Sequence, residues 1–396
     1  MKILWYSNAP WAKTGYGNQT RLFWWRIQKL GHEVTIGANY GLSGAVLNVS
    51  EEGEATRVLP LGFSQYGNDI LASYAEYVKA DVVITLFDSW VFDNAVTGRF
   101  RWCPWLPVDH DPLPGRIKDA LGPAWQPIAY SQFGQRKLIE AGFESAMYVP
   151  HGIDTKEFAP ADRDQARKDL NFPMEYDFLA VMVAANKGTP SRKSFPEVLR
   201  AWKEFVKDHP KSLLYLHTHP GTEMGGLDLM GLLTYLDMPK EVIVFPDMFW
   251  NVLGYPDSYM ARVYNAADVL LSPSQGEGFG LPIVEAQASG CPVIVSECTS
   301  MSELCFSGWS VGKDAGTLHP FYTPLGSDQF IPSVDGIRDC LEMAYEKRHY
   351  DKVRRKAREG ALPYDADTVT ETYWKPVLEQ IAADIAEGDV LEKVTL

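Results

Sequence analysis

Residues 272–297 read SPSQGEGFGLPIVEAQASGCPVIVSE, and this stretch decides the fold. An apolar strand leads into a loop broken by glycines, then into a helix-length segment and a second apolar run. Pro282 lies just inside the expected helix and Gly290 just past its end, which is the usual placement of these residues. The order of strand, glycine loop, helix and strand is typical of a βαβ unit in a parallel sheet.

The same alternation extends over the rest of the chain. In the first half we predict strands at Ile3–Tyr6, Glu33–Ile36, Val82–Leu86, Trp105–Val108, Pro127–Ala129 and Met147–Val149. In the second half we predict strands at Phe178–Ala184, Ser212–His217, Val242–Phe245, Val269–Leu271 and Pro292–Ser296. The predicted helices include Gln19–Leu30, Phe195–Asp208 and Ser258–Ala266. We therefore expect an α/β chain with two Rossmann-like halves that face each other across a ligand-binding cleft.

The domain boundary is expected near VPHGIDTKEFAP, where prolines and a glycine break regular structure. A chain of 396 residues exceeds what one hydrophobic core usually serves. We predict an N-terminal domain over residues 1–155 and a C-terminal domain over residues 156–365. Residues 366–396 are expected to contain a further helix at Thr368–Ala386 and a loose tail, and the sequence does not say what this helix packs against.

Composition disfavours several classes of protein. The net charge of -14 gives no general basic field for a nucleic acid, and we expect the basic run from Lys352 to Arg358 to be a solvated helix face. The five cysteines form no C-x-x-C pair, which favours reduced thiols over disulfides or zinc. The opening MKILWYSNAP is too short for a signal peptide or a membrane span, so a soluble cytoplasmic protein is expected.

A pair of carboxylates surrounds the glycine loop. Glu277 lies in the loop and Glu285 in the following helix, so both can face one cavity and accept hydrogen bonds from sugar hydroxyls. Gly278 and Gly280 let the backbone approach a ligand, and the N–H groups at the helix start can bind an anion such as a diphosphate. The alternative is an exposed loop and a surface helix in which Glu285 only favours the helix N-terminus.

A departing diphosphate needs cations, because its charge is costly in a partly closed site. The segment AANKGTPSRKSFPEVLRAW follows the first strand of the second half and supplies Lys187, Arg192 and Lys193. The alternative is a solvated loop, and Arg192 is either a phosphate contact or a solvated neighbour.

The first half contributes a glycine-containing loop and a histidine. In NAPWAKTGYGNQTRLFW, Gly15 and Gly17 lie between a strand and a helix, where backbone amides can meet a phosphate or a sugar. In LPVDHDPLPG, a strand ends next to His110, at the edge of the sheet where α/β proteins bind ligands. The alternative for a single histidine is a structural role.

The triplet Asp109, His110, Asp111 also imitates a D-x-D metal site. The flanking pattern is that of a parallel sheet, and Lys187 and Lys193 supply the charge that a metal would bring. We therefore predict no metal and no cofactor.

Taken together, these stretches resemble the family-4 retaining glycosyltransferases of the GT-B fold. The resemblance implies that Glu277 and the backbone at Phe279 and Gly280 contact the donor sugar, while Glu285 binds the nucleotide ribose. The rest of the implied site consists of Lys187 and Lys193 on the diphosphate, His110 near the sugar, and donor contacts at Gly15, Gly17, Arg192, Gly278 and Leu281. The chain departs from the family pattern in having Lys187 for arginine and Ser194 for glycine.

The resemblance implies a retaining, metal-independent hexosyltransferase that uses a UDP- or GDP-sugar. The acceptor is left open as a hydroxyl of a glycan, a lipid, a protein or a modified DNA base, since the opening segment is also similar to glycosyltransferases of tailed phages. Two alternatives are a nucleotide-sugar epimerase or hydrolase on the same fold, and a catalytically silent sugar-nucleotide binding module.

Overall fold

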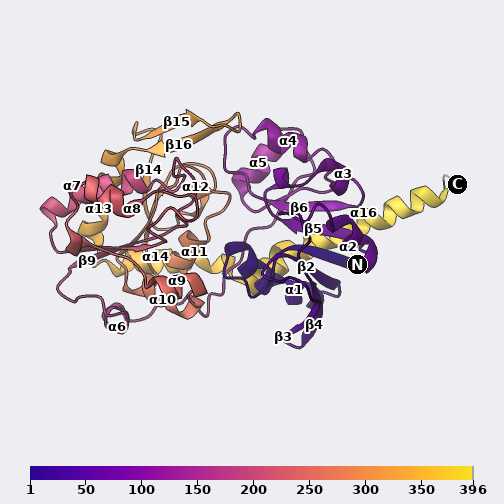
Figure 1. The fold of residues 1–396 in the computed structure, drawn as a ribbon, viewed down its shortest axis with the longest axis horizontal. Coiled ribbons are helices and arrows are strands. Elements are labelled where there is room, and N and C mark those ends of the chain that lie inside the picture. The colour runs from indigo at the N-terminus through magenta and orange to yellow at the C-terminus, as the bar shows by residue number, and fades with distance from the viewer. Residues whose placement is uncertain (395–396) are drawn as a thin grey trace. The chain divides into compact units, whose positions relative to one another are not determined.

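The computed structural model describes residues 1–394 and divides into two compact units (Figure 1). Unit 1 comprises Met1–Gly152, Pro324–Ser327 and the chain from Tyr364 onward, and unit 2 comprises Ile153–Thr323 and Asp328–Pro363. The division after Gly152 falls within the proline- and glycine-containing segment where we expected the boundary. The C-terminal segment, which we had set apart, belongs to unit 1.

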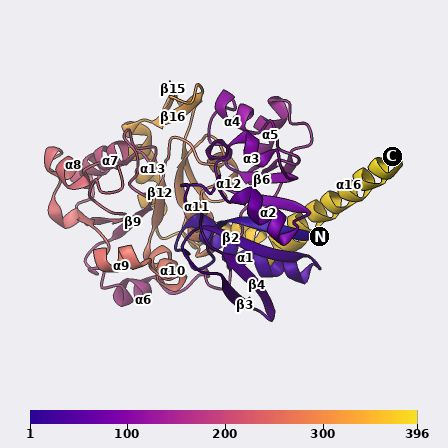
Figure 2. The same ribbon diagram turned by 45° about the vertical axis from the view of Figure 1, so that its right-hand side comes forward.

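Unit 1 is built on an eight-stranded sheet of order β3-β4-β2-β1-β5-β6-β7-β8. Its strands are β1 (Lys2–Asn8), β2 (Glu33–Tyr40), β3 (Leu47–Glu51), β4 (Glu54–Leu59), β5 (Val82–Leu86), β6 (Trp102–Leu106), β7 (Ile128–Ala129) and β8 (Met147–Tyr148). All neighbouring strands are parallel except the β3–β4 hairpin, which projects from one edge (Figure 2). Its turn at Glu52 and Gly53 has positive φ at both residues. We did not predict this hairpin, because β3 is mostly exposed and has no apolar run.

The N-terminal helices of unit 1 are α1 (Gly15–Lys29), α2 (Leu71–Val78), α3 (Asn94–Thr97), α4 (Gly115–Ala120) and α5 (Gln132–Glu140), with a 3-10 turn at Ser89–Val91. The core between sheet and helices contains four of the eight tryptophans of residues 1–152, namely Trp5, Trp24, Trp102 and Trp105, each at most 2% exposed. These rings are therefore core, as their placement beside strands and helices indicates, whereas Trp11 is 40% exposed.

The C-terminal helices complete unit 1. They comprise α15 (Ala366–Val369), a π-helical turn at Thr370–Trp374 and α16 (Lys375–Val394). Trp374 packs against Trp5 and Trp105 with ring centroids 5.6 and 4.9 Å away, and Asp367 accepts a hydrogen bond from Arg26 at 2.8 Å. The sequence did not reveal what the C-terminal helix packs against, and the structure shows that Trp374 packs on the tryptophans of the N-terminal sheet. Of the expected loose tail, α16 includes the part up to Val394, and residues 395–396 lie outside the described residues.

Unit 2 is built on a parallel six-stranded sheet of order β11-β10-β9-β12-β13-β14 and a separate antiparallel hairpin. The sheet strands are β9 (Phe178–Val183), β10 (Ser212–His217), β11 (Ile243–Val244), β12 (Val269–Ser272), β13 (Val293–Ser296) and β14 (Gly308–Val311). The hairpin strands are β15 (Leu318–Tyr322) and β16 (Asp328–Pro332). The sequence predicted β9 to β13, and the three strands after them lack a continuous buried apolar run.

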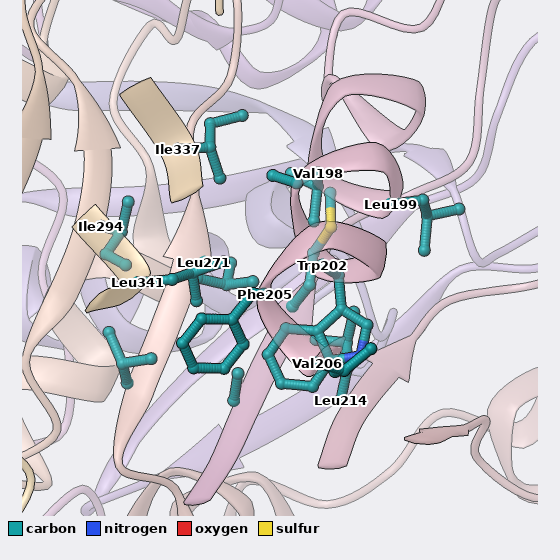
Figure 3. Packing of buried hydrophobic residues seen from close by; sticks show 14 of the residues in the cluster. Val198, Leu199, Trp202, Phe205, Val206, Leu214, Leu271, Ile294, Ile337 and Leu341 are labelled. Carbon is teal, nitrogen blue, oxygen red and sulfur yellow. The ribbon is translucent and has the colours of Figure 1, made fainter. Parts of the chain in front are cut away.

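Helices cover both faces of this sheet. They are α6 (Arg163–Asp169), α7 (Phe195–Asp208), α8 (Leu229–Tyr235), α9 (Met248–Leu253), α10 (Asp257–Ala266), α11 (Leu281–Ala288), α12 (Met301–Leu304), α13 (Val334–Lys347) and α14 (Asp351–Ala361), with 3-10 turns at Lys240–Val242 and Leu362–Tyr364. Figure 3 shows Trp202 and Phe205 of α7 in the core together with Leu341 of α13. The 3.6-residue period of apolar side chains in α7 directs this face inward.

The sequence suggested that the basic run on α14 is a solvated helix face, but two of its arginines bind backbone carbonyls. Arg354 donates to the backbone oxygen of Ala267 at 3.0 Å, and Arg358 donates to that of Ala288 at 2.9 Å. These guanidinium groups satisfy carbonyls that would otherwise lack partners. The spacing of charges along the helix cannot reveal these contacts, because it does not show whether an arginine faces water or a backbone carbonyl of another segment.

The described chain contains no helix long and apolar enough to cross a membrane. All five cysteines are free thiols, and only Cys305 is more than marginally exposed.

Candidate donor site

The glycine loop between β12 and α11 is hydrogen-bonded to the segment that follows β13. The backbone N–H of Glu277 donates to Thr299 Oγ1 at 3.0 Å. Ser300 Oγ lies 2.8 and 2.6 Å from the carbonyl oxygens of Glu277 and Phe279, which share its single hydroxyl hydrogen. Thr299 and Ser300 were not among our predicted site residues, and their only signal in the sequence was their place just after an apolar strand.

The carboxylate of Glu277 is buried and ion-paired. Arg192 Nη1 lies 3.0 Å from one carboxylate oxygen, and Lys193 Nζ donates to the other. The loop that carries both cations, between β9 and α7, is joined to the glycine loop by a hydrogen bond from Gln275 N–H to Arg192 O at 2.8 Å. The structure thus brings together two cations and a carboxylate that are far apart in the sequence.

Two effects act on the pKa of Glu277 in opposite directions. Burial raises the pKa, whereas Arg192, Lys193 and a hydrogen bond from Ser274 lower it, and the result is a pKa of about 2. Glu277 is therefore ionised at neutral pH. The side chains of Arg192 and Lys193 keep 39% and 22% of their surface exposed, so both can also contact a ligand.

Lys187 is exposed and lies in the same β9–α7 loop, but no contact with Glu277 is seen. The preceding residue anchors the loop: Asn186 is 1% exposed, donates to Leu227 O at 2.7 Å and accepts from Leu227 N–H at 2.9 Å. Of the three predicted cations, the structure therefore joins Arg192 and Lys193 to Glu277, and leaves Lys187 facing solvent from an anchored loop.

Ser194 shows why glycine suits this position. It has φ 57° and ψ 34°, in the left-handed region, and it is the residue before α7. For a residue other than glycine, the left-handed backbone conformation costs about 1–2 kcal/mol of conformational free energy. The Ser194 hydroxyl is also fully buried and has no hydrogen-bond partner within residues 1–394.

The start of α11 presents backbone N–H groups. Gly280 precedes the helix with φ 113°, and a Cβ at this position would lie 2.8 Å from Ile283 Cδ1, so a larger residue is strained here. No side chain caps the helix, and Pro282 in its first turn has no N–H. The N–H groups around Phe279, Gly280 and Leu281 are where an anion would gain most from the helix dipole. Phe279 itself is 3% exposed, so its ring belongs to the packing and only its backbone can serve a ligand.

Glu285 lies in the second turn of α11 and is partly buried. Burial and the nearby carboxylate of Asp257 raise its pKa to about 7, against the lowering effect of a hydrogen bond from Tyr264. The Tyr264 hydroxyl donates to Glu285 Oε2 at 3.0 Å. Tyr264 is on α10 and no sequence pattern pointed to it.

His110 in unit 1 forms a short pair with its neighbour. The ring is 4% exposed, and Nδ1 lies 2.7 Å from Asp109 Oδ1. This carboxylate fixes the ring orientation and leaves Nε2 as the nitrogen for a substrate. Asp111 pairs instead with Lys137 at 2.9 Å. The two carboxylates of the D-x-D pattern therefore have different partners, and no group of metal-ligating side chains occurs among the described residues.

The first glycine loop is more structural than its sequence suggested. Gly17 N–H donates to Thr14 Oγ1 at 3.0 Å, the N-cap bond of α1, so this amide is already used. A Cβ on Gly17 would lie 2.2 Å from Ala12 O, which explains the need for glycine. Gly15 is exposed at the helix start.

Comparison with known proteins places these features in a family. Residues 244–320 match the family described as glycosyl transferases group 1. A D-inositol 3-phosphate glycosyltransferase of Nocardia farcinica is 29% identical over 193 residues, which make up 47% of this chain and 40% of that protein. An uncharacterized glycosyltransferase of Sulfolobus islandicus rod-shaped virus 1 is 23% identical over 245 residues, which make up 60% of this chain and 68% of that protein. The match thus spans less than half the length of the inositol phosphate enzymes.

Solved structures share the fold over nearly the whole chain. Sucrose-phosphate synthase from Thermosynechococcus elongatus has a TM-score of 0.74 at 17% identity, with 97% of this chain and 100% of that chain covered. HepE from Anabaena in complex with UDP-glucose has a TM-score of 0.68 at 15% identity, with 98% and 100% covered. Glu277 and Glu285 both fall inside the matched segment 244–320. The chain therefore contains a segment that matches the group 1 glycosyltransferases, and it has the two-domain GT-B fold of the solved structures.

Proposed function

We propose that this chain is a retaining, metal-independent glycosyltransferase that moves a hexose from a nucleotide-diphosphate sugar to an acceptor hydroxyl. The observation that carries the proposal is the buried, ionised Glu277 held by Arg192 and Lys193 beside the uncapped start of α11. A carboxylate suits sugar hydroxyls, and cations with an adjacent helix N-terminus suit a diphosphate.

The proposed reaction breaks the bond between the anomeric carbon and the diphosphate oxygen and forms a bond from that carbon to the acceptor oxygen. The acceptor attacks from the face that the diphosphate leaves, and the acceptor proton passes to the departing diphosphate oxygen. Lys193 and Arg192 stabilise the negative charge of the leaving group as it develops. His110, oriented by Asp109, positions the sugar.

The proposed donor is a UDP-sugar, with a GDP-sugar as the alternative. The first choice is supported by HepE, a structural neighbour solved in complex with UDP-glucose. The predicted metal independence is supported by the contacts of Asp109 with His110 and of Asp111 with Lys137, since each carboxylate already has a partner within the protein. The acceptor is proposed only as a hydroxyl group.

The donor is tested by thermal denaturation in the presence of single nucleotide sugars. A ligand at about 100 times its dissociation constant stabilises a protein by roughly 2.7 kcal/mol. We expect UDP-sugars to raise the melting temperature of the wild type and to have a much smaller effect on Lys193→Ala. If no nucleotide sugar raises the melting temperature, the proposed donor site is wrong.

The chemistry is tested with UDP-glucose and a panel of hydroxyl acceptors, with NMR of the anomeric proton of the product. We expect an α-linked product from the α-linked donor, at the same rate with and without a chelator. A β-linked product would exclude retention, and loss of activity with the chelator would exclude metal independence. Release of UDP at an equal rate in the absence of any acceptor would indicate a hydrolase instead.

A further inference from the structure

Unit 2 contains a second concave site that shares no residue with the donor site. It is a cavity of about 750 Å³ on the α10 side of the sheet, next to the edge strand β11. Its walls come from the segment 169–176 before β9, from β10, and from the segment 241–262 that includes β11, α9 and part of α10. Neither Glu277 nor Glu285 lines it.

Aromatic rings form the floor and the walls of this cavity. Phe172 and Tyr215 are buried and meet edge to face at 5.5 Å. Tyr255 and Tyr259 are stacked with their centroids 4.1 Å apart. Trp250 of α9 contributes a ring that is 52% exposed. Aromatic faces of this kind bind flat apolar surfaces such as the C–H face of a sugar ring.

Carboxylates surround the aromatic rings. Asp169, Glu241 and Asp247 line the cavity and are exposed, and Arg262 is the single basic residue among the lining residues. Within residues 1–394, none of these four side chains forms an ion pair. Carboxylates that are not ion-paired accept hydrogen bonds from hydroxyl groups, and their excess over the single arginine disfavours phosphates and nucleotides.

The walls are fixed in place before any ligand arrives. The Tyr176 hydroxyl donates to Glu241 O at 2.6 Å, and the Tyr255 hydroxyl donates to Asp247 O at 3.3 Å. The Asp247 carboxylate caps α9 by accepting from the backbone N–H of Trp250 at 3.1 Å, which holds this carboxylate at the start of the helix that carries Trp250. A site whose backbone is already positioned loses less entropy on binding.

We infer that this cavity is a binding site for a neutral carbohydrate, separate from the donor site. A sugar ring stacks on Trp250 and donates hydroxyl hydrogen bonds to Glu241 and Asp247, while Tyr255 and Tyr259 line the wall. Aromatic rings can also bind a cation, but this cavity is larger than a single small cation requires, and Arg262 repels such a cation. A cavity of this volume accommodates a small oligosaccharide.

The test uses the full chain without nucleotide and trisaccharides of glucose, mannose, galactose and N-acetylglucosamine as probes. Saturation-transfer NMR identifies the probes that bind, and calorimetry measures their affinity. We expect at least one trisaccharide to bind the wild type, with affinity at least about tenfold lower for Trp250→Ala and Glu241→Gln. The matched control is Phe249→Ala, the neighbour on α9 that is 67% exposed and does not line the cavity; its affinity should stay at the wild-type level.

Competition separates this site from the donor site. We expect saturating UDP to leave trisaccharide binding unchanged, and Trp250→Ala to leave the stabilisation by UDP-glucose unchanged. Displacement of the trisaccharide by UDP would overturn the inference, because the cavity would then be part of the donor site. It would also be overturned if no trisaccharide bound the wild type, or if Trp250→Ala, Glu241→Gln and Phe249→Ala all bound the trisaccharide equally well. Binding of the small cation choline instead of a trisaccharide would overturn it too, because the aromatic rings would then form a cation site.

Discussion

Glu277 and Glu285 belong to the same loop-and-helix segment, and both are largely removed from water, yet their surroundings act on them in opposite ways. Around Glu277, Arg192 and Lys193 outweigh the effect of burial and bring the pKa down to about 2. Around Glu285, burial is reinforced by another carboxylate, Asp257, and the pKa rises to about 7. Burial is common to both sites, so the neighbouring charges account for the difference.

This contrast suggests different tasks for the two carboxylates. Glu277 stays charged across the whole physiological range and keeps two cations in place beside the glycine loop. Glu285 is near its midpoint at neutral pH and can become fully ionised when a ligand donates hydrogen bonds to it. Proton uptake or release on donor binding should therefore involve Glu285 and not Glu277.

The largest expected effect comes from removing the charge at the first of these sites. In Glu277→Gln, the charged hydrogen-bond acceptor for the sugar is lost and the two cations lose their partner. We expect kcat to fall by about 100- to 1,000-fold. The fold should be kept, since Arg192 and Lys193 are partly exposed and can be solvated. Turnover and circular dichroism are the measurements, and wild-type turnover would show that Glu277 does not act on the substrate.

Removing one of the two cations should have the next largest effect. In Lys193→Ala, donor binding should weaken by about 1–3 kcal/mol through loss of charge-assisted hydrogen bonds to the diphosphate. The exposed Lys187 has no contact with Glu277, so Lys187→Ala should weaken binding less. The control is Lys211→Ala, because Lys211 is exposed and lies outside the predicted site. Calorimetry with UDP measures all three variants, and an equal loss in each would show that only general positive charge matters.

Glu285→Gln tests the other side of the comparison through stability. The pKa of Glu285 is higher in the folded chain than in the unfolded chain, so ionisation opposes folding as the pH rises from about 4.5 to about 7. The variant lacks this cost. We expect it to match the wild type near pH 4 and to be more stable by about 1–2 kcal/mol at pH 8, given the partial exposure of the side chain. Urea denaturation across this range would contradict the raised pKa if the difference did not change with pH.

The smallest expected effect is that of Ser194→Gly, beside the cations that set the low pKa of Glu277. Glycine relieves the left-handed backbone strain and removes a buried hydroxyl without a partner, although it increases the entropy of the unfolded chain. We expect a net gain of about 1 kcal/mol in unfolding free energy, measured by thermal denaturation, with donor affinity unchanged. A loss of stability would show that the hydroxyl makes a favourable contact.

Much of the fold was readable because parallel strands are short apolar runs separated by helices. Val82–Leu86, Ser212–His217 and Phe195–Asp208 have the bounds that their hydrophobic pattern predicts. The β3–β4 hairpin was missed because β3 is mostly exposed and has no apolar run, and the packing of Trp374 on Trp5 was missed because no local pattern reports a contact between distant parts of a chain. The predicted site residues stay predictions, but the structure shows which of them are neighbours.

The sequence by itself determined the class of fold and the positions of the carboxylates, cations and glycines, since these depend on local spacing. The tertiary structure alone decided which charges meet. It put Arg192 and Lys193 on Glu277 and Tyr264 on Glu285. The physical reason is that protonation and hydrogen bonding depend on distances of a few ångströms between segments far apart in sequence, which no spacing along the chain specifies.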